Sequence, residues 1–337
     1  MQALHPPVFE TRLTRLFGVT HPIFVGGMMY HSREDFVAAC ARAGCMAFMT
    51  AKSCRNAHEL RASLIRCIEL AEGAPVGLNL SISRFRSNEI LDAALKIAQE
   101  LGITRFETAG SHPGDYIARI QGQGGIVIHK ATQLRHAVKA ADSGVDALSI
   151  VGIEAGGHPG TNPHPGHVIL AQLLKEVDVP VAIGGGIGTG GQVLGALAQG
   201  AGAALVVSRL LTASEIRVHV NFRTRMVAAG IDDSVAVLSS LKDTWRVLRN
   251  GTSDWVQRRE RELGDTATHA DFGEVLRGDY ARTHAYLGGD MDRGMMSCSS
   301  AVGHADRVAP AGDILFQLMA ETAEAWRALS DAARFDG

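Results

Sequence analysis

The chain has 337 residues, of which 46% are hydrophobic and 20% are charged, and its 33 basic and 35 acidic side chains give a formal net charge of −2. This balance excludes a disordered chain and argues against a nucleic-acid binder, because no basic cluster interrupts it. The length fits one large α/β unit or two smaller ones. Glycine is unusually frequent, with 38 residues, which indicates a fold that needs backbone without Cβ atoms.

The cysteines and the amino terminus predict a cytoplasmic protein. The five cysteines are odd in number and form no C-x-x-C pair, as expected of free thiols in a reducing compartment. The amino terminus carries charges and has no apolar core, so no secretory signal is expected. Residues 179–208 lack any charge, but nine glycines interrupt them, and we expect this stretch in a buried core and not in a membrane.

A short apolar run, a break rich in small polar residues and a helical stretch recur eight times along the chain. The predicted strands are residues 22–26, 46–50, 76–80, 105–108, 126–129, 147–151, 181–184 and 203–207. Amphipathic helices are expected between them, for example at 33–43, 57–70, 88–101, 132–143 and 191–200. Continuous apolar strands that alternate with helices indicate a parallel sheet buried on both faces. Eight such units predict an α/β fold of the (β/α)8 TIM barrel type over residues 1–211.

The pattern changes after Leu211. Residues 212–308 are charged, show helical periodicity and offer no strand candidate as far as Asp290, so we expect a C-terminal helical cap subdomain there. In residues 309–337 the apolar side chains recur at helical spacing. This predicts a C-terminal helix that packs back on the barrel.

Glycine and polar residues collect where the predicted strands end. In a barrel the active site lies at the carboxyl ends of the strands, so these residues are the candidates for chemistry. They are Gly26, Gly27, Met28, Tyr30 and His31 after the first strand, Asn79 in the third, Lys130 at the end of the fifth, Gly156, Gly157 and His158 after the sixth, Gly185 and Gly186 after the seventh, and Ser208 and Arg209 after the eighth.

The glycine turn at residues 184–190 lies where barrels bind phosphate, through N–H groups of the loop and of the following helix. Its letters also satisfy G-x-G-x-x-G. A dinucleotide site would need an acid at the end of the next strand, where the sequence reads Val206-Val207-Ser208-Arg209. A mononucleotide phosphate site is therefore favoured over a dinucleotide site and over a purely structural turn.

His158 lies in a loop of glycines without helical or strand periodicity, so core packing does not explain it. Its ordinary pKa near 6.5 suits a proton acceptor, and a hydrogen-bonded structural histidine is the alternative. His164 and His167 follow, but no carboxylate or thiolate shares a ligand spacing with them, and no metal is expected. Lys130 is interpreted as a cation beside an anionic cofactor and not as a Schiff-base nucleophile, because the paired acid and base of an aldolase are lacking.

Several segments together resemble one enzyme family: HPI-x-x-GGM, PVGLNL, ETAG, VIHKAT, GVDA, GIEAGGHPG, GGGIGTG and a final AGDIL. They are similar to the flavin-dependent nitronate monooxygenase (2-nitropropane dioxygenase) family, which includes a branch with NADH:quinone reductases. The resemblance implies FMN as the cofactor and His158 as the catalytic base beside its ring. The residues implied to hold FMN are Gly26, Gly27, Met28, Asn79, Lys130, Gly156, Gly157, Gly185, Gly186, Ser208 and Arg209.

Substrate contacts are expected from Tyr30, His31, Arg84 and Ser297. The leading function is oxidation of a nitronate or nitroalkane with O2. The alternatives are an NAD(P)H:quinone reductase, a tailoring oxidoreductase or isomerase for an enoyl or polyketide-like substrate whose anionic end meets Arg84 and Arg86, and a flavin-binding protein without activity. The expected partners are a small-molecule substrate and O2 or a quinone as electron acceptor, with no nucleic acid and no membrane, and a homodimer is a possible assembly.

Overall fold

The computed structural model describes residues 8–83 and 87–333, and eight parallel strands form its centre. They close into a barrel in chain order, with β1 pairing both β2 and β8. Their bounds are β1 Ile23–Val25, β2 Met46–Thr50, β3 Gly77–Ile82, β4 Arg105–Gly110, β5 Ile126–Ala131, β6 Ala147–Val151, β7 Val181–Gly184 and β8 Ala203–Leu205. The predicted (β/α)8 barrel is confirmed.

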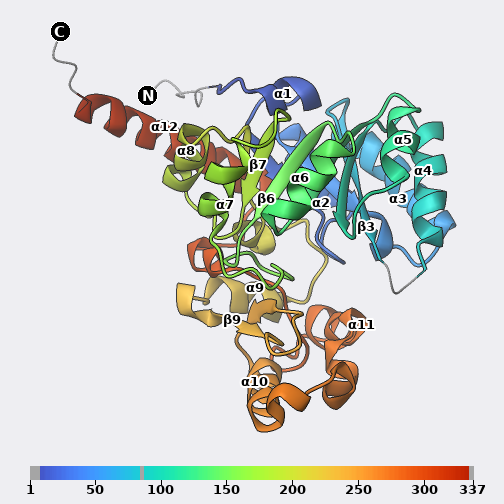
Figure 1. Cartoon of the computed structure of the whole chain (residues 1–337), viewed down its shortest axis with the longest axis vertical. Helices are drawn as coiled ribbons and strands as arrows, with labels where there is room; N and C mark the ends of the chain where they lie inside the picture. The colour runs from blue at the N-terminus through green and yellow to red at the C-terminus, as the bar shows by residue number, and fades with distance from the viewer. Residues whose placement is uncertain (1–7, 84–86, 334–337) are drawn as a thin grey trace.

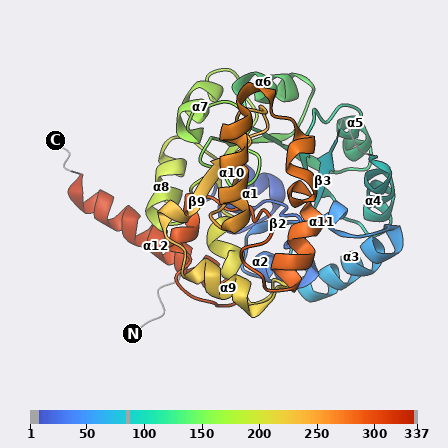
Figure 2. The ribbon, with the colours of Figure 1, turned by 90° about the horizontal axis from the view of Figure 1, so that it is seen from below.

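Helices surround the barrel, as seen along its axis in Figure 2. The strands are buried because both of their faces are covered, the inner by the barrel interior and the outer by these helices. The helices are α2 Glu34–Arg42, α3 Ala57–Ala71, α4 Glu89–Glu100, α5 Tyr116–Gln121, α6 Leu134–Asp142, α7 Gly166–Leu173 and α8 Gly190–Ala198. The five helices predicted by range lie within two residues of α2, α3, α4, α6 and α8 at each end, and the short α5 and α7 carry no predicted range.

A six-residue helix, α1 (Arg12–Phe17), closes the amino end of the barrel. Phe17 packs edge-on against Phe24 of β1 and Phe48 of β2, with ring centroids 5.0 and 6.2 Å apart. All three rings are fully buried or nearly so. The aromatic cluster fills this end, and the opposite end, where the strands finish, faces the C-terminal cap (Figure 1).

The expectation that residues 212–290 contain no strand is wrong. Two antiparallel strands, β9 (Ser234–Val237) and β10 (Trp245–Leu248), lie between helices α9 (Val220–Val227) and α10 (Gly251–Leu263). Alternate residues such as Val235, Val237 and Val247 pack into one buried cluster, which is the period of a strand. Helical structure resumes only at α10, where the Asn250 side chain accepts a hydrogen bond from the Ser253 N–H.

The last helix, α12 (Ala311–Ala332), packs against α8 and α2, and its far end projects from the barrel (Figures 1 and 2). Buried residues such as Leu315 and Leu318 face the barrel helices, whereas Trp326 and Leu329 are exposed. Among the residues that the structure describes, no helix combines the length and the apolar character that a membrane crossing requires.

Candidate active site

A buried carboxylate joins three of the predicted site residues at the carboxyl end of the barrel. Glu107 on β4 is 1% exposed. Its Oε1 lies 3.1 Å from Lys130 Nζ, and its Oε2 accepts from the Gly27 N–H at 2.9 Å and from Asn79 Nδ2 at 2.6 Å. Sequence reasoning did not single out Glu107. The available signal was an acidic residue inside a buried strand, which demands partners.

Gly26 and Gly27 follow β1, and side chains of neighbouring strands leave little room there for a Cβ atom. A Cβ on Gly27 would lie 2.5 Å from Asn79 Cβ, and one on Gly26 would lie 3.0 Å from Glu107 Oε1. Met28 follows in a buried position, and its N–H donates to Ser32 Oγ at 2.9 Å. Of the predicted residues of this loop, Gly26 and Gly27 therefore lie directly beside Glu107.

The turn after β7 has the conformation of a backbone cradle. Gly185 and Gly186 have φ angles of +103° and +66°, which side-chain-bearing residues rarely adopt. A Cβ on either glycine would also lie within 3.2 Å of Glu154 Cγ. Within the described part of the chain, the N–H groups of Gly185 and Gly186 donate to no other residue. The turn therefore fits a phosphate group, whose oxygens accept from backbone N–H donors.

The N-terminus of α8, which we expected to share in phosphate binding, is already occupied. Thr189 caps the helix, and Glu321 of α12 accepts from the Gly190 N–H at 2.9 Å. The same carboxylate pairs with the buried guanidinium of Arg209 at 2.6 and 2.8 Å. The side chain of Arg209 thus fastens α12 to the barrel, and only its backbone N–H stays a predicted phosphate donor.

Ser208 and the loop before α12 meet at the same end of the barrel. The Ser208 hydroxyl is buried and accepts from both the N–H and the hydroxyl of Ser299, each at 2.9 Å. Gly156 lies against the same loop, where a Cβ would come within 2.5 Å of the Cys298 carbonyl carbon. Because Ser208 accepts twice, its own hydrogen is left to donate. Ser299 is a further site residue that the sequence reasoning did not select.

The cap holds His158 from one side. The His158 ring stacks on the indole of Trp245 in β10, with ring centroids 4.7 Å apart and planes 25° apart. Trp245 is fixed in turn by donating from Nε1 to Ser297 Oγ at 2.8 Å. On the backbone, Gly157 and Arg246 exchange two hydrogen bonds of 3.0 and 2.7 Å. Strand β10, which the sequence analysis did not predict, therefore positions His158, the predicted base. Ser297 orients Trp245, and Trp245 in turn packs against His158.

His158 is exposed to solvent, and Trp245 covers one face of its ring. Desolvation of the ring lowers the pKa of His158 below its ordinary value of 6.5. At neutral pH the imidazole is therefore mainly unprotonated. An unprotonated imidazole that is open to a ligand on one side can accept a proton.

Tyr30 and His31 lie where the barrel meets the cap. Both line a cavity of about 200 Å³ together with Ser53, Arg217 and residues of the π-helix Arg282–Leu287. His31 is 5% exposed and packs against Phe222 and Tyr286, and burial lowers the pKa of His31 to about 4. A neutral, packed ring of this kind is a core residue, so direct substrate contact by His31 stays a prediction without a contact to support it.

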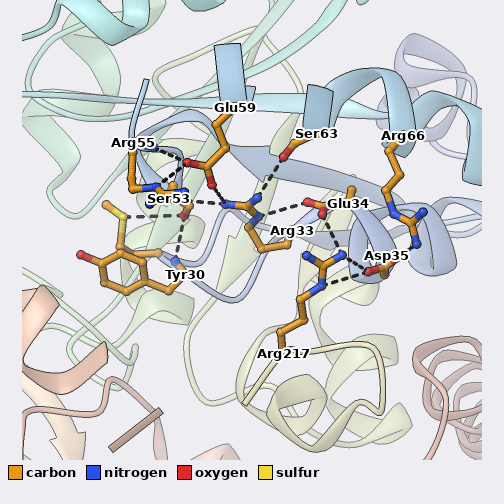
Figure 3. Close-up of polar contacts among 11 residues, drawn as sticks. Tyr30, Arg33, Glu34, Asp35, Ser53, Arg55, Glu59, Ser63, Arg66 and Arg217 are labelled. Atoms are coloured by element: carbon orange, nitrogen blue, oxygen red, sulfur yellow. Dashed lines mark hydrogen bonds and ion pairs between the residues drawn. The ribbon is translucent and has the colours of Figure 1, made fainter. Parts of the chain in front are cut away.

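An ion-pair network beside this cavity fastens the segment after the barrel to α2 and α3 (Figure 3). Arg33 pairs with Glu34 and Glu59, each at 3.1 Å. Arg217 pairs with Glu34 at 2.8 Å and with Asp35 at 2.5 Å. The network ties the start of the cap to the barrel wall.

Two further sequence predictions concern the arginines after β3 and a metal site. Arg84 and Arg86 lie outside the described residues. Within residues 8–83 and 87–333, no group of three or more His, Cys, Asp or Glu side chains is arranged to hold a metal ion.

A parallel barrel that gathers a glycine cradle, a lysine and an unprotonated histidine at the carboxyl ends of its strands has the architecture of a barrel enzyme. The family model for nitronate monooxygenase matches residues 10–321. The chain therefore belongs to the nitronate monooxygenase family and is an oxidoreductase of that family, as the sequence motifs predict.

Individual relatives differ in their named activities. An enzyme of Rhodococcus jostii, (3aS,4S,5R,7aS)-5-hydroxy-7a-methyl-1-oxo-octahydro-1H-indene-4-carboxyl-CoA dehydrogenase, is 30% identical over 225 residues, which cover 67% of this chain and 62% of that enzyme. A nitronate monooxygenase of Paraburkholderia phytofirmans is 34% identical over 125 residues, which cover 35% of this chain and 34% of that protein. The solved structure of FabK from Thermotoga maritima has a TM-score of 0.86 and 26% identity, covering 96% of this chain and all of that one.

Proposed function

We propose that this protein is an FMN-dependent oxidoreductase that oxidises a small carbon acid or its anion, a nitroalkane or nitronate in the leading case, with O2 as electron acceptor. The observation that carries the proposal is His158, whose ring stacks on Trp245 and whose pKa is lowered by desolvation. A carbon acid needs a base in its unprotonated form, and His158 is in that form at neutral pH.

The residues around the cradle fit the cofactor. When bound, FMN takes up the electrons of the substrate and passes them to O2. The N–H groups of Gly185 and Gly186 and the hydroxyl of Ser208 hold its phosphate. Lys130 provides a cation near the ring, and His158 removes the proton next to the nitro group of a neutral nitroalkane. A nitronate has already lost that proton, so it needs no base.

A second candidate substrate is an acyl thioester, which belongs to the enoyl and polyketide-like class. It is favoured by the Rhodococcus jostii relative, whose name places a carboxyl-CoA group on its substrate. The proton next to a thioester carbonyl is also acidic, so the same base at His158 would serve. An NAD(P)H:quinone reductase is the remaining candidate, and hydride transfer from NADH needs no base.

Anaerobic stopped-flow mixing tests the function directly. The yellow protein is mixed separately with a nitronate, with a saturated acyl-CoA and with NADH, and loss of the flavin absorbance is followed. Rapid reduction by the nitronate alone supports the leading function. Reduction only by the thioester or only by NADH replaces it with the corresponding alternative, and reduction by none indicates a flavin-binding protein without these activities.

The purified protein is expected to be yellow and to release FMN, not FAD, on heating. The reason is that the turn at Gly185 and Gly186 forms one phosphate cradle, which suffices for a mononucleotide. Chromatography of the released flavin checks this. Recovery of FAD, or a colourless protein that FMN cannot reconstitute, would contradict the cofactor assignment.

The activity with a neutral nitroalkane is expected to depend on the pKa of His158. Because desolvation lowers that pKa, kcat/KM should rise with pH through a pKa below 6.5 and be constant at neutral pH. In Trp245→Ala the ring is better hydrated, so the rise should move to higher pH, whereas Trp245→Phe should keep it low. A rise that stays in place in Trp245→Ala would mean that another group controls the profile.

A further inference from the structure

Glu107 is a buried, charged residue that has no direct role in the proposed reaction. Both of its oxygens are engaged, Oε1 by Lys130 at 3.1 Å and Oε2 by Gly27 and Asn79 at 2.9 and 2.6 Å. The partners come from β5, the loop after β1 and β3, so one carboxylate joins three neighbouring parts of the barrel end. Burying a carboxylate is costly unless such donors surround it, and an apolar residue could fill a barrel core without that cost.

We propose, resting on the proposed FMN site, that Glu107 is a positioning residue that holds the Lys130 ammonium in an ion pair and thereby limits how strongly Lys130 stabilises reduced flavin. Lys130 is the partner that can reach a ligand, because its side chain is 21% exposed whereas that of Glu107 is 1% exposed. Lys130, the positively charged member of the ion pair, is therefore the one that a ligand at the carboxyl end of the barrel can contact.

The effect of the pair follows from electrostatics. A cation near the flavin ring favours the reduced state, which carries more negative charge, and protein charges near the ring tune its reduction potential. A carboxylate 3.1 Å from that cation cancels much of its field at the ring. Glu107 thus keeps the reduction potential lower than Lys130 alone would set it.

Glu107→Gln removes the negative charge of the side chain but keeps its size and shape. The glutamine oxygen can still accept from Gly27 and Asn79, but its NH2 group faces the Lys130 ammonium, and two donors do not pair. Lys130 is then released from its partner. We expect the ratio of reduced to oxidised flavin, measured against a two-electron reference dye during anaerobic reductive titration, to increase about tenfold, which corresponds to about 30 mV.

Glu34→Gln is the matched control. Glu34 is also a buried glutamate, 3% exposed, and it pairs with Arg33 and Arg217 at 3.1 and 2.8 Å on the outside of the barrel (Figure 3). Its replacement removes one buried negative charge without changing Lys130. The ratio of reduced to oxidised flavin should stay at the wild-type value.

Lys130→Met tests whether Glu107 acts through Lys130. Removing the cation should lower the reduced-to-oxidised ratio about tenfold, opposite to the effect of Glu107→Gln. In the Lys130→Met background, Glu107→Gln should change the ratio by clearly less than tenfold, because the two residues are coupled. A full tenfold change in that background would overturn the positioning role.

The outcomes separate this inference from the proposed function. Wild-type protein that binds no FMN rejects both. Flavin-loaded Glu107→Gln with an unchanged ratio overturns only the role of Glu107. If Glu107→Gln does not fold or does not bind FMN, Lys130→Met decides: a lowered ratio supports the inference, and an unchanged ratio overturns it.

Discussion

His158→Ala is expected to lower kcat/KM for a neutral nitroalkane by about 10²- to 10⁴-fold, the usual loss when a general base is removed. The reason is that the neutral substrate must lose a proton, and His158 is the proposed base, whose pKa lies below its ordinary value. Turnover of the preformed nitronate should fall far less, because that anion has already lost the proton. Steady-state rates with the two forms of one nitroalkane, measured before they interconvert, give the comparison.

The variant should keep its FMN, because the proposed phosphate cradle at Gly185 and Gly186 lies on another loop. Flavin content therefore serves as the control for folding. Any activity with NADH should also be nearly unchanged, since hydride transfer needs no base. An equal loss of all three activities would assign His158 to positioning of the substrate or the ring and would reject it as the base, while the cofactor assignment would stand.

The barrel was predictable because its signal is local. Strands β2, β6 and β7 match their predicted ranges, since each is a short and mainly apolar run. Strands β3, β4 and β5 extend two residues beyond the predicted ends, to Ile82, Gly110 and Ala131. At those ends polar and small residues pair with neighbouring strands, and an apolar pattern cannot show such pairing.

The hairpin of β9 and β10 was missed because its strands are four residues long and stand next to a strongly helical segment. The sequence from Trp245 onward has helical charge spacing only from Gly251, where α10 begins. In the preceding Trp245–Leu248, Trp245, Val247 and Leu248 are buried, Arg246 is partly buried, and the segment pairs with β9. Because this strand was not predicted, the contact between Trp245 and His158 could not be predicted from the sequence either.

The contacts of Glu107 could not be predicted from the sequence for a different reason. Its partners Gly27, Asn79 and Lys130 are 80, 28 and 23 residues away along the chain. The sequence predicts that each of these partners ends a strand, so it places them at one end of the barrel. It does not show which of their donors converge on one oxygen, because that depends on the pairing register of β3, β4 and β5.

Gly186→Val is expected to lose most of its flavin while the barrel still folds. Gly186 has a φ of +66°, and a β-branched residue is strongly disfavoured there, at a cost of roughly 1–3 kcal/mol. The new Cβ would also lie 3.2 Å from Glu154 Cγ, so the Glu154 side chain or the turn must shift by a few tenths of an ångström. We expect this shift, together with the strained φ, to displace the N–H groups from the proposed phosphate site. We expect FMN affinity to fall at least about tenfold, since each 1.4 kcal/mol is one factor of ten. Titration of the apoprotein with FMN measures it.

Gly191→Val is the control for the effect of a valine near the cradle. Gly191 lies in the first turn of α8, its φ is not positive, and a Cβ there meets nothing within 4 Å. This variant should bind FMN like the wild type and differ only by a small gain in helix propensity, because valine is less unfavourable than glycine inside a helix. If Gly186→Val also binds FMN fully, the turn after β7 is structural, and the phosphate must lie elsewhere. If Gly191→Val loses FMN as well, the loss reports on α8 and not on the cradle, because Gly191, unlike Gly186, does not have a positive φ.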